Sequence, residues 1–222
     1  MFKAIIFDMD GVIADSEPLH LRAENITLAP YGIQITEEDC REFRGRSAKL
    51  LLENLITKYS LDVNLEEIFL VHKKILLQLY SKEVNPIKGS LQLLRWFKEQ
   101  KYRLALASSS NTQLVSSVIK KFKIQAMFDT IVSGSEVNNF KPAPDIFLEA
   151  ASHLSLHPEK SLVIEDSTAG VKAAKSAGMF CIGFRSPHTP NQDLSRADVI
   201  IDDLTIFLAK LEKKSLEEVI FP

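Results

Sequence analysis

Two pairs of acidic residues stand directly after apolar runs of the sequence. Asp8 and Asp10 follow the run 4–7, and Gly11 then lets the chain turn. Glu165 and Asp166 follow the run 162–164 in the same way. One aspartate after a strand is usually a turn or capping residue, but two such pairs favour a shared site. Carboxylate oxygens are ligands that Mg²⁺ prefers, so the four acids predict a magnesium site.

Hydroxyl and ammonium groups occupy comparable places in the chain. Ser108 and Ser109 follow the apolar run 104–107, at the predicted start of a helix, where N–H groups bind anions. Lys141 lies in a loop stiffened by prolines. Alone, the serines would be read as helix caps and the lysine as a surface residue. The serines therefore offer an anion site, and the order of acidic pair, serines, lysine and acidic pair is far more specific than any one of these pieces.

Elements that must position these residues alternate regularly. Short apolar runs are separated by helical stretches of about ten residues, a pattern typical of an α/β fold with a doubly wound parallel sheet. Ligands of such sheets bind at the carboxyl ends of the strands. The predicted strands are 4–7, 104–107, 130–132, 162–164, 181–184 and 199–201, and the helices between them are 89–100, 112–122, 144–153 and 169–177.

The residues between the first two strands follow a helical period. Apolar residues from Leu65 to Leu79 recur at i, i+3, i+4 and i+7, and Asn64 suits an N-cap. His72 lies on this apolar stripe and is expected to be structural. We therefore predict a Rossmann-like core, 1–15 and 84–222, with an inserted α-helical domain, 16–83.

Composition excludes several classes of protein. The chain has 222 residues, of which 45% are apolar and 25% charged, so it is expected to be globular. A net charge of −2 favours neither nucleic acid nor a membrane as partner. Cys40 and Cys181 form no CxxC pair, and the first residues do not read as a signal peptide. A cytoplasmic monomer is expected.

The four motifs together resemble those of the haloacid-dehalogenase-like hydrolase superfamily. The resemblance covers essentially the whole chain, and the branch is that of the β-phosphoglucomutase-like enzymes and sugar phosphatases with a helical cap. It implies that Asp8 is the nucleophile and that Asp10 is the general acid and base. It also implies that Ser108 and Lys141 bind the phosphoryl group. Mg²⁺ would be held by Asp8, Asp166 and the Asp10 carbonyl, supported by Glu165.

Cap residues are expected to choose the substrate. His20 matches a position that contacts substrate or Asp10 in related enzymes, although a surface histidine is the alternative. Gly45 lies in a loop resembling the specificity loop of the family. Mutases of this group have an arginine three positions later, where this chain has Ala48. Arg46 or Lys49 are the possible substitutes.

The expected function is therefore a Mg²⁺-dependent phosphatase acting on a small phosphorylated metabolite. An intact Asp10 favours phosphorus chemistry, because the true dehalogenases lack an aspartate at that position. A β-phosphoglucomutase is the second reading. An inactive binding module is a remote third, since no motif residue is missing.

Overall fold

The computed structural model describes residues 1–189 and 191–221. Six strands form its main sheet: β1 (Ala4–Phe7), β4 (Arg103–Ser108), β5 (Thr130–Ser133), β6 (Ser161–Glu165), β7 (Phe180–Phe184) and β8 (Val199–Ile201). They are all parallel, in the order β5-β4-β1-β6-β7-β8. β1 and β6 are therefore central neighbours, and the acidic residues that follow them meet at one edge of the sheet.

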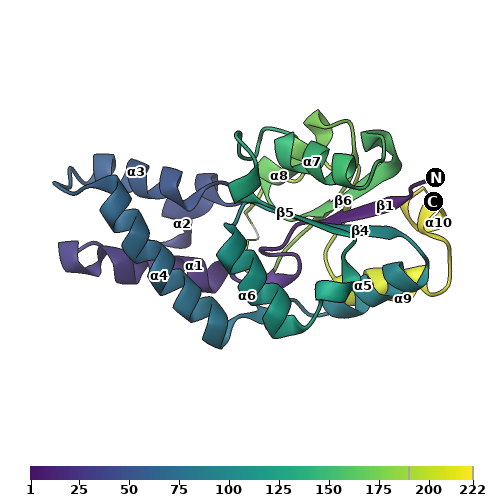
Figure 1. Ribbon diagram of the computed structural model, residues 1–222, viewed down its shortest axis with the longest axis horizontal. Helices are drawn as coiled ribbons and strands as arrows, with labels where there is room; N and C mark the ends of the chain where they lie inside the picture. Colours follow the sequence, from purple (N-terminus) through teal and green to yellow (C-terminus); the bar gives the residue numbers. More distant parts are fainter. Residues whose placement is uncertain (190, 222) are drawn as a thin grey trace.

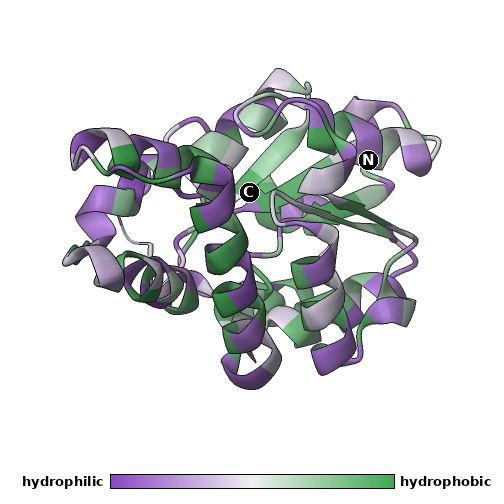
Figure 2. Ribbon diagram, turned by 60° about the vertical axis from the view of Figure 1, so that its left-hand side comes forward, coloured by the Kyte–Doolittle hydropathy of each residue, from purple (hydrophilic) through white to green (hydrophobic). Residues whose placement is uncertain are grey.

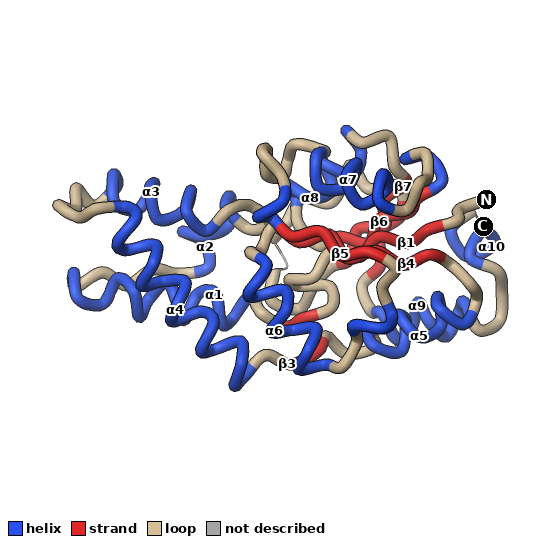
Figure 3. The backbone as a smooth tube through the Cα atoms, in the orientation of Figure 1, coloured by secondary structure: helices blue, strands red, loops and turns tan. Residues whose placement is uncertain are grey.

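Helices cover both faces of this sheet (Figures 1 and 3). Along β1, Ile5 and Phe7 pack into one apolar core while Ala4 and Ile6 pack into another, because successive side chains of a strand point to opposite faces. Figure 2 shows the sheet as largely hydrophobic. The predicted doubly wound α/β fold is confirmed. On the first face lie α5 (Ser90–Glu99), α6 (Thr112–Phe122), α9 (Leu204–Leu211) and α10 (Leu216–Ile220), and on the second lie α7 (Asp145–His153) and α8 (Thr168–Ser176).

Four α-helices lie in the chain between Asp15 and Asn85: α1 (Glu17–Leu28), α2 (Glu37–Cys40), α3 (Ala48–Lys58) and α4 (Leu65–Glu83). We call residues 17–83 the helical segment. It extends to the left of the sheet in Figure 1 and has a small apolar core of its own, which includes Leu28, Leu51 and Ile68. The Asn64 side chain accepts from the N–H groups of Glu66 and Glu67, so the predicted N-cap is confirmed.

Two short strands join the helical segment to the rest of the chain. β2 (Ala14–Asp15) precedes it, β3 (Asn85–Pro86) follows it, and the two pair antiparallel. The chain thus leaves and returns at adjacent points. Among the described residues, no helix is both long and apolar enough to cross a membrane.

Candidate active site

Lys141 lies beside the acidic residues at the ends of β1 and β6. Its side chain is 1% exposed, and its ammonium donates to Asp8 Oδ1 at 2.5 Å and to Glu165 Oε1 at 2.7 Å. Burial alone would lower the pKa of Lys141, but the two carboxylates raise it above its usual value, so the ammonium stays charged. The surface-lysine reading of Lys141 is therefore wrong.

Three carboxylates lie close together here, and Lys141 contacts two of them. Ligand oxygens of Asp8, Glu165 and Asp166 lie within 4.8 Å of one another, and all three residues are buried. Burial raises the pKa of Asp8 and of Asp166 well above the usual value, and the neighbouring carboxylates add to this effect. Negative charge in excess of Lys141, presented by hard oxygen ligands, fits a divalent cation such as Mg²⁺.

Glu165 holds its neighbours in place. Its Oε1 accepts from Lys141, and its Oε2 accepts from the backbone N–H of Ser167 at 2.6 Å and from the hydroxyl of Ser167 at 3.0 Å. Both oxygens are thus engaged, so Asp8 and Asp166 are the carboxylates best placed to ligate a metal ion.

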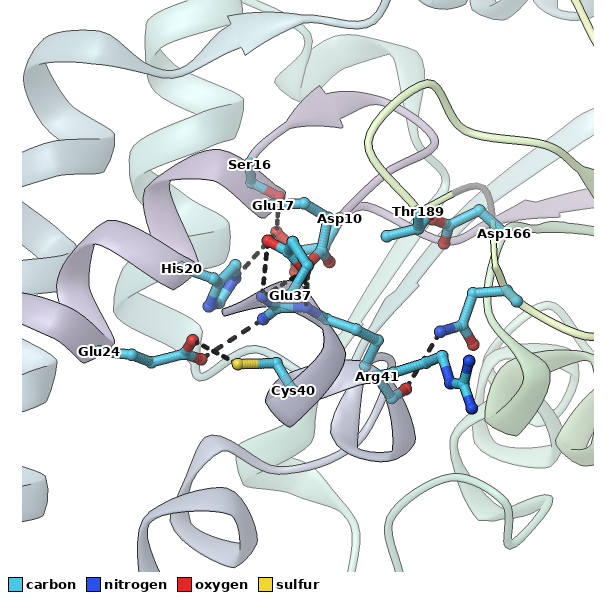
Figure 4. Close-up of polar contacts among 12 residues, drawn as sticks. Asp10, Ser16, Glu17, His20, Glu24, Glu37, Cys40, Arg41, Asp166 and Thr189 are labelled. Atoms are coloured by element: carbon cyan, nitrogen blue, oxygen red, sulfur yellow. Dashed lines mark hydrogen bonds and ion pairs between the residues drawn. The ribbon is translucent and has the colours of Figure 1, made fainter. Parts of the chain in front are cut away.

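Backbone geometry brings the Asp10 loop close to Asp166. Gly11 has a φ of +80°, and a Cβ there would lie 2.0 Å from Asp166 Oδ2. A side chain at this position is excluded, which explains the glycine. On its other side, Asp166 Oδ2 accepts from the hydroxyl of Thr189 at 2.9 Å (Figure 4).

The Asp10 carboxylate lies outside the three-carboxylate group and accepts from hydroxyls at both of its oxygens. Burial would raise the pKa of Asp10, but His20 and these hydroxyls hold it below its usual value. The sequence predicted Ser108 as a phosphate ligand, yet here its hydroxyl points to Asp10. The donors are Ser16 at 2.6 Å and Tyr80 at 2.5 Å to Oδ1, and Ser110 at 2.8 Å and Ser108 at 3.3 Å to Oδ2.

His20, on α1 of the helical segment, lies close to Asp10. Its Nε2 lies 2.7 Å from the hydroxyl of Tyr80 and 3.8 Å from Asp10 Oδ1. Burial would lower the pKa of His20, but Asp10 and Glu17 raise it above its usual value. A proton on Nε2 is donated to Tyr80, which in turn donates to Asp10. The structure therefore places His20 at the site, and adds Tyr80 to it.

The predicted specificity loop docks on the serines of the core. Ser109 donates its hydroxyl to the carbonyl of Gly45 at 2.9 Å. Gly45 has a φ of +74°, and a Cβ there would lie 2.1 Å from the hydroxyl oxygen of Ser167. The approach of this loop to the sheet therefore requires glycine.

A cavity of about 290 Å³ lies between the sheet and the helical segment. Asp8 and Asp10 line it from the sheet, and Arg46, Lys49 and His72 are among the residues that line it from the helical segment. Lys49 pairs with Glu66, whereas Arg46 is exposed.

Arg44 forms a second buried charge cluster, beside the cavity. Its guanidinium lies 2.8 Å from Glu17, 3.4 Å from Glu24 and 2.9 Å from Glu37. Cys40 donates its thiol to Glu24 at 3.2 Å (Figure 4). No sequence pattern indicated this cluster, because its members are spread over three elements that only packing brings together.

Residues 5–184 match the sequence model of the haloacid dehalogenase-like hydrolases. The chain belongs to this family and is an enzyme of its hydrolase type, as the resemblance predicted.

Named relatives include both phosphatases and mutases. The chain is 35% identical to a phosphorylated carbohydrates phosphatase of Thermotoga maritima over 80% of its length and 82% of that protein. It is 32% identical to the β-phosphoglucomutase of Bacillus subtilis over 93% of both chains. The crystal structure of CbbY from Rhodobacter sphaeroides in complex with phosphate superposes with a TM-score of 0.85, at 29% identity, covering 96% of this chain and 100% of that one.

Proposed function

We propose that this enzyme is a Mg²⁺-dependent phosphatase that hydrolyses a small phosphomonoester, a sugar phosphate or a similar metabolite. The observation that carries the proposal is the buried group of Asp8, Glu165 and Asp166, two of which pair with Lys141, beside a cavity that Asp8 lines. Phosphoryl transfer needs positioning and charge neutralisation above all; the carboxylates would hold the metal ion that, with Lys141, neutralises the phosphoryl group. The name of the Thermotoga relative supports the substrate class.

Asp8 is the proposed nucleophile. Its free carboxylate oxygen attacks phosphorus as the bond to the leaving oxygen breaks, which gives an aspartyl-phosphate and divides one difficult step into two. Lys141 holds Asp8 in place, and Lys141, Ser108 and Ser109 are the proposed ligands of the transferring group. The two hydroxyls, which here donate to Asp10 and to the Gly45 carbonyl, would turn to the phosphoryl group when substrate binds. Asp8, Asp166 and the carbonyl of Asp10 would hold Mg²⁺, which would supply further positive charge to the phosphoryl oxygens.

Asp10 is the proposed general acid and base. Hydroxyls from both sides of the cavity keep its carboxylate oriented and ionised before substrate binds. An arriving phosphate dianion raises the pKa of Asp10, because a nearby like charge disfavours ionisation. The protonated form then donates to the leaving oxygen. The resulting carboxylate takes a proton from the water that attacks the aspartyl-phosphate.

The helical segment is proposed to act as a cap, with domain limits 16–83. Its contacts with the core, at Gly45 and at Tyr80, close the cavity over Asp8 and exclude bulk water. Gly45, Arg46, Lys49 and His20 are the proposed contacts with the rest of the substrate.

Phosphate release from a panel of sugar phosphates, phosphoglycolate and nucleotides tests the proposal. We expect turnover that rises with Mg²⁺ and is lost when EDTA removes the metal, then restored by added Mg²⁺. Full activity in EDTA, or no release from p-nitrophenyl phosphate under any condition, would contradict it.

A phosphomutase is the second candidate. Arg46 lines the cavity without an ion-pair partner among the described residues, so it is available to a second phosphate. Ala48, where related mutases have arginine, favours hydrolysis instead. Incubation with β-glucose 1-phosphate and a bisphosphate primer separates the two, since glucose 6-phosphate marks a mutase and free phosphate a phosphatase.

A further inference from the structure

His72 is the feature of the cavity that the proposed chemistry leaves unexplained. Among the described residues, five buried side-chain polar atoms lack a hydrogen-bond partner, and two of them belong to residues lining the cavity: Glu17 Oε2 and His72 Nε2. Glu17 Oε2 lies 2.8 Å from the Arg44 guanidinium, so its charge is compensated. His72 Nε2 has no such compensation, although an unpaired buried acceptor is destabilising.

The tautomer of His72 follows from its neighbour on α1. The Thr27 hydroxyl donates to the carbonyl of Ala23 at 2.7 Å, so its single proton is already used. The Thr27 oxygen lies 3.4 Å from His72 Nδ1 and only accepts there. Nδ1 therefore carries the proton, and Nε2 presents a lone pair.

His72 is uncharged at neutral pH. The side chain is 1% exposed, and burial lowers its pKa to about 4 against a smaller opposing effect of Glu24. Glu24 and His20, the charged groups that act on it, also line the cavity. A neutral imidazole with a free lone pair binds a hydroxyl or amide donor and not an anion.

The position of His72 sets the length of the ligand. Tyr80, which donates to Asp10, lies eight residues further along α4, and at 1.5 Å per residue the backbone positions of His72 and Tyr80 are roughly 12 Å apart along the helix axis. A substrate whose phosphate reacts at Asp8 reaches His72 only if it is an extended molecule.

We propose that His72 is a specificity residue that accepts a hydrogen bond from a hydroxyl at the far end of an extended, polyhydroxylated phosphomonoester, such as an open-chain sugar or sugar-alcohol phosphate. The proposal rests on the phosphatase function proposed above and narrows its substrate class. Thr27 is the positioning residue that fixes the imidazole.

Substrates of different length test the proposal. Sorbitol 6-phosphate, mannitol 1-phosphate and ribitol 5-phosphate are long enough to reach His72, whereas glycerol 3-phosphate is not. For His72→Leu we expect the ratio of kcat/KM, best long substrate over glycerol 3-phosphate, to fall about 10-fold, mainly through KM, because the far hydroxyl loses its acceptor. His72→Gln, which keeps an acceptor, should recover part of the ratio, and the exposed His157→Leu should leave it unchanged.

Binding provides a readout that does not depend on turnover. Asp8→Asn enzyme titrated with sorbitol 6-phosphate by calorimetry should bind about 10-fold more weakly when His72→Leu is added. An unchanged ratio and unchanged binding in folded His72→Leu would overturn the proposal. So would a wild-type enzyme that hydrolyses glycerol 3-phosphate and none of the long substrates. Tight binding that depends on His72, without phosphate release from any substrate, would instead reject the phosphatase function.

Discussion

Two clusters of this molecule each place carboxylates around one buried cation, yet they are built for different ends. Arg44 faces three glutamates, one of which, Glu37, has a side chain that is 43% exposed and so is partly solvated. Lys141 faces two carboxylates, while a third, Asp166, accepts from the Thr189 hydroxyl and has no ion pair within the described part of the chain.

The difference lies in how many of the carboxylates the cation of each cluster contacts. The wide guanidinium of Arg44 presents five N–H donors, enough to serve several carboxylates at once. The ammonium of Lys141 is a compact charge with three donors, and its ion pairs reach Asp8 and Glu165 but not Asp166. The guanidinium therefore ties all the carboxylates of its cluster together, whereas the ammonium leaves a carboxylate that fits a metal ion.

Removing the proposed nucleophile, Asp8, should give the largest effect and the clearest contrast. We expect Asp8→Asn to lower phosphomonoester turnover by more than about 10⁴-fold, because no other carboxylate can form the aspartyl-phosphate. Its midpoint of thermal unfolding should stay equal or rise, since one member of a repelling group is gone. The exposed Asp62→Asn is the control. A strongly destabilised Asp8→Asn would contradict the contrast with the Arg44 cluster, whose loss is expected to act on stability.

Removing the other cation should act on stability. Arg44→Leu strands Glu17 and Glu24 as buried, unpaired charges, so we expect the free energy of unfolding to fall by about 3–5 kcal/mol, measured with urea. Arg22→Gln is the matched control. Its ion pair with Glu83 is exposed, and its loss should cost less than about 1 kcal/mol. Equal effects of the two substitutions would contradict the role given to burial.

The pH dependence of unfolding tests whether the helical segment tolerates a positive charge on His72. The pKa of His72 is about 4 in the folded chain against 6.5 when unfolded, so the unfolded state binds the extra proton first. The free energy of unfolding therefore has its full value, as far as His72 is concerned, above pH 6.5. It falls by about 3 kcal/mol as the pH is lowered towards 4. Urea unfolding of the wild type and of His72→Leu across this range should diverge by that amount. Parallel curves would contradict the shift.

The smallest effect is expected at Tyr80, where the helical segment contacts Asp10 of the core. Tyr80→Phe removes the hydroxyl between His20 and Asp10 while keeping the aromatic ring in the core. We expect kcat to fall about 10-fold. The acidic limb of the pH profile should move to higher pH, because Asp10 loses one of the donors that hold it ionised. The exposed Tyr31→Phe should leave both unchanged. An unaltered pH profile would remove Tyr80 from the site.

The sequence was sufficient for the parts of the fold that depend on local pattern. The helix 112–122 and the strand 199–201 were predicted with their observed limits, because Asn111 caps the one and the other is a continuous apolar run. The helix Leu204–Leu211 was missed. Its residues are almost all apolar, and such a stretch lacks the period that identifies a helix.

The residues of the site also divide into those that the sequence predicts and those that only the structure shows. Asp8, Lys141, Glu165 and Asp166 converge because each belongs to a connection at the same edge of the sheet, and parallel strands bring those connections together. Tyr80 could not be predicted as a partner of Asp10. It lies at an apolar position of α4, and only the packing of that helix against the core shows where its hydroxyl ends.

The pairing of β2 with β3 has a consequence for engineering. Ala14 faces Pro86 and Asp15 faces Asn85, so the ends of the helical segment emerge side by side from the two strands of a ribbon. Replacing residues 17–83 by the equivalent segment of a relative, or by a tight turn, requires no change in the path of β1 or β4. The molecule is therefore suited to chimeras in which one catalytic edge is fitted with interchangeable recognition modules.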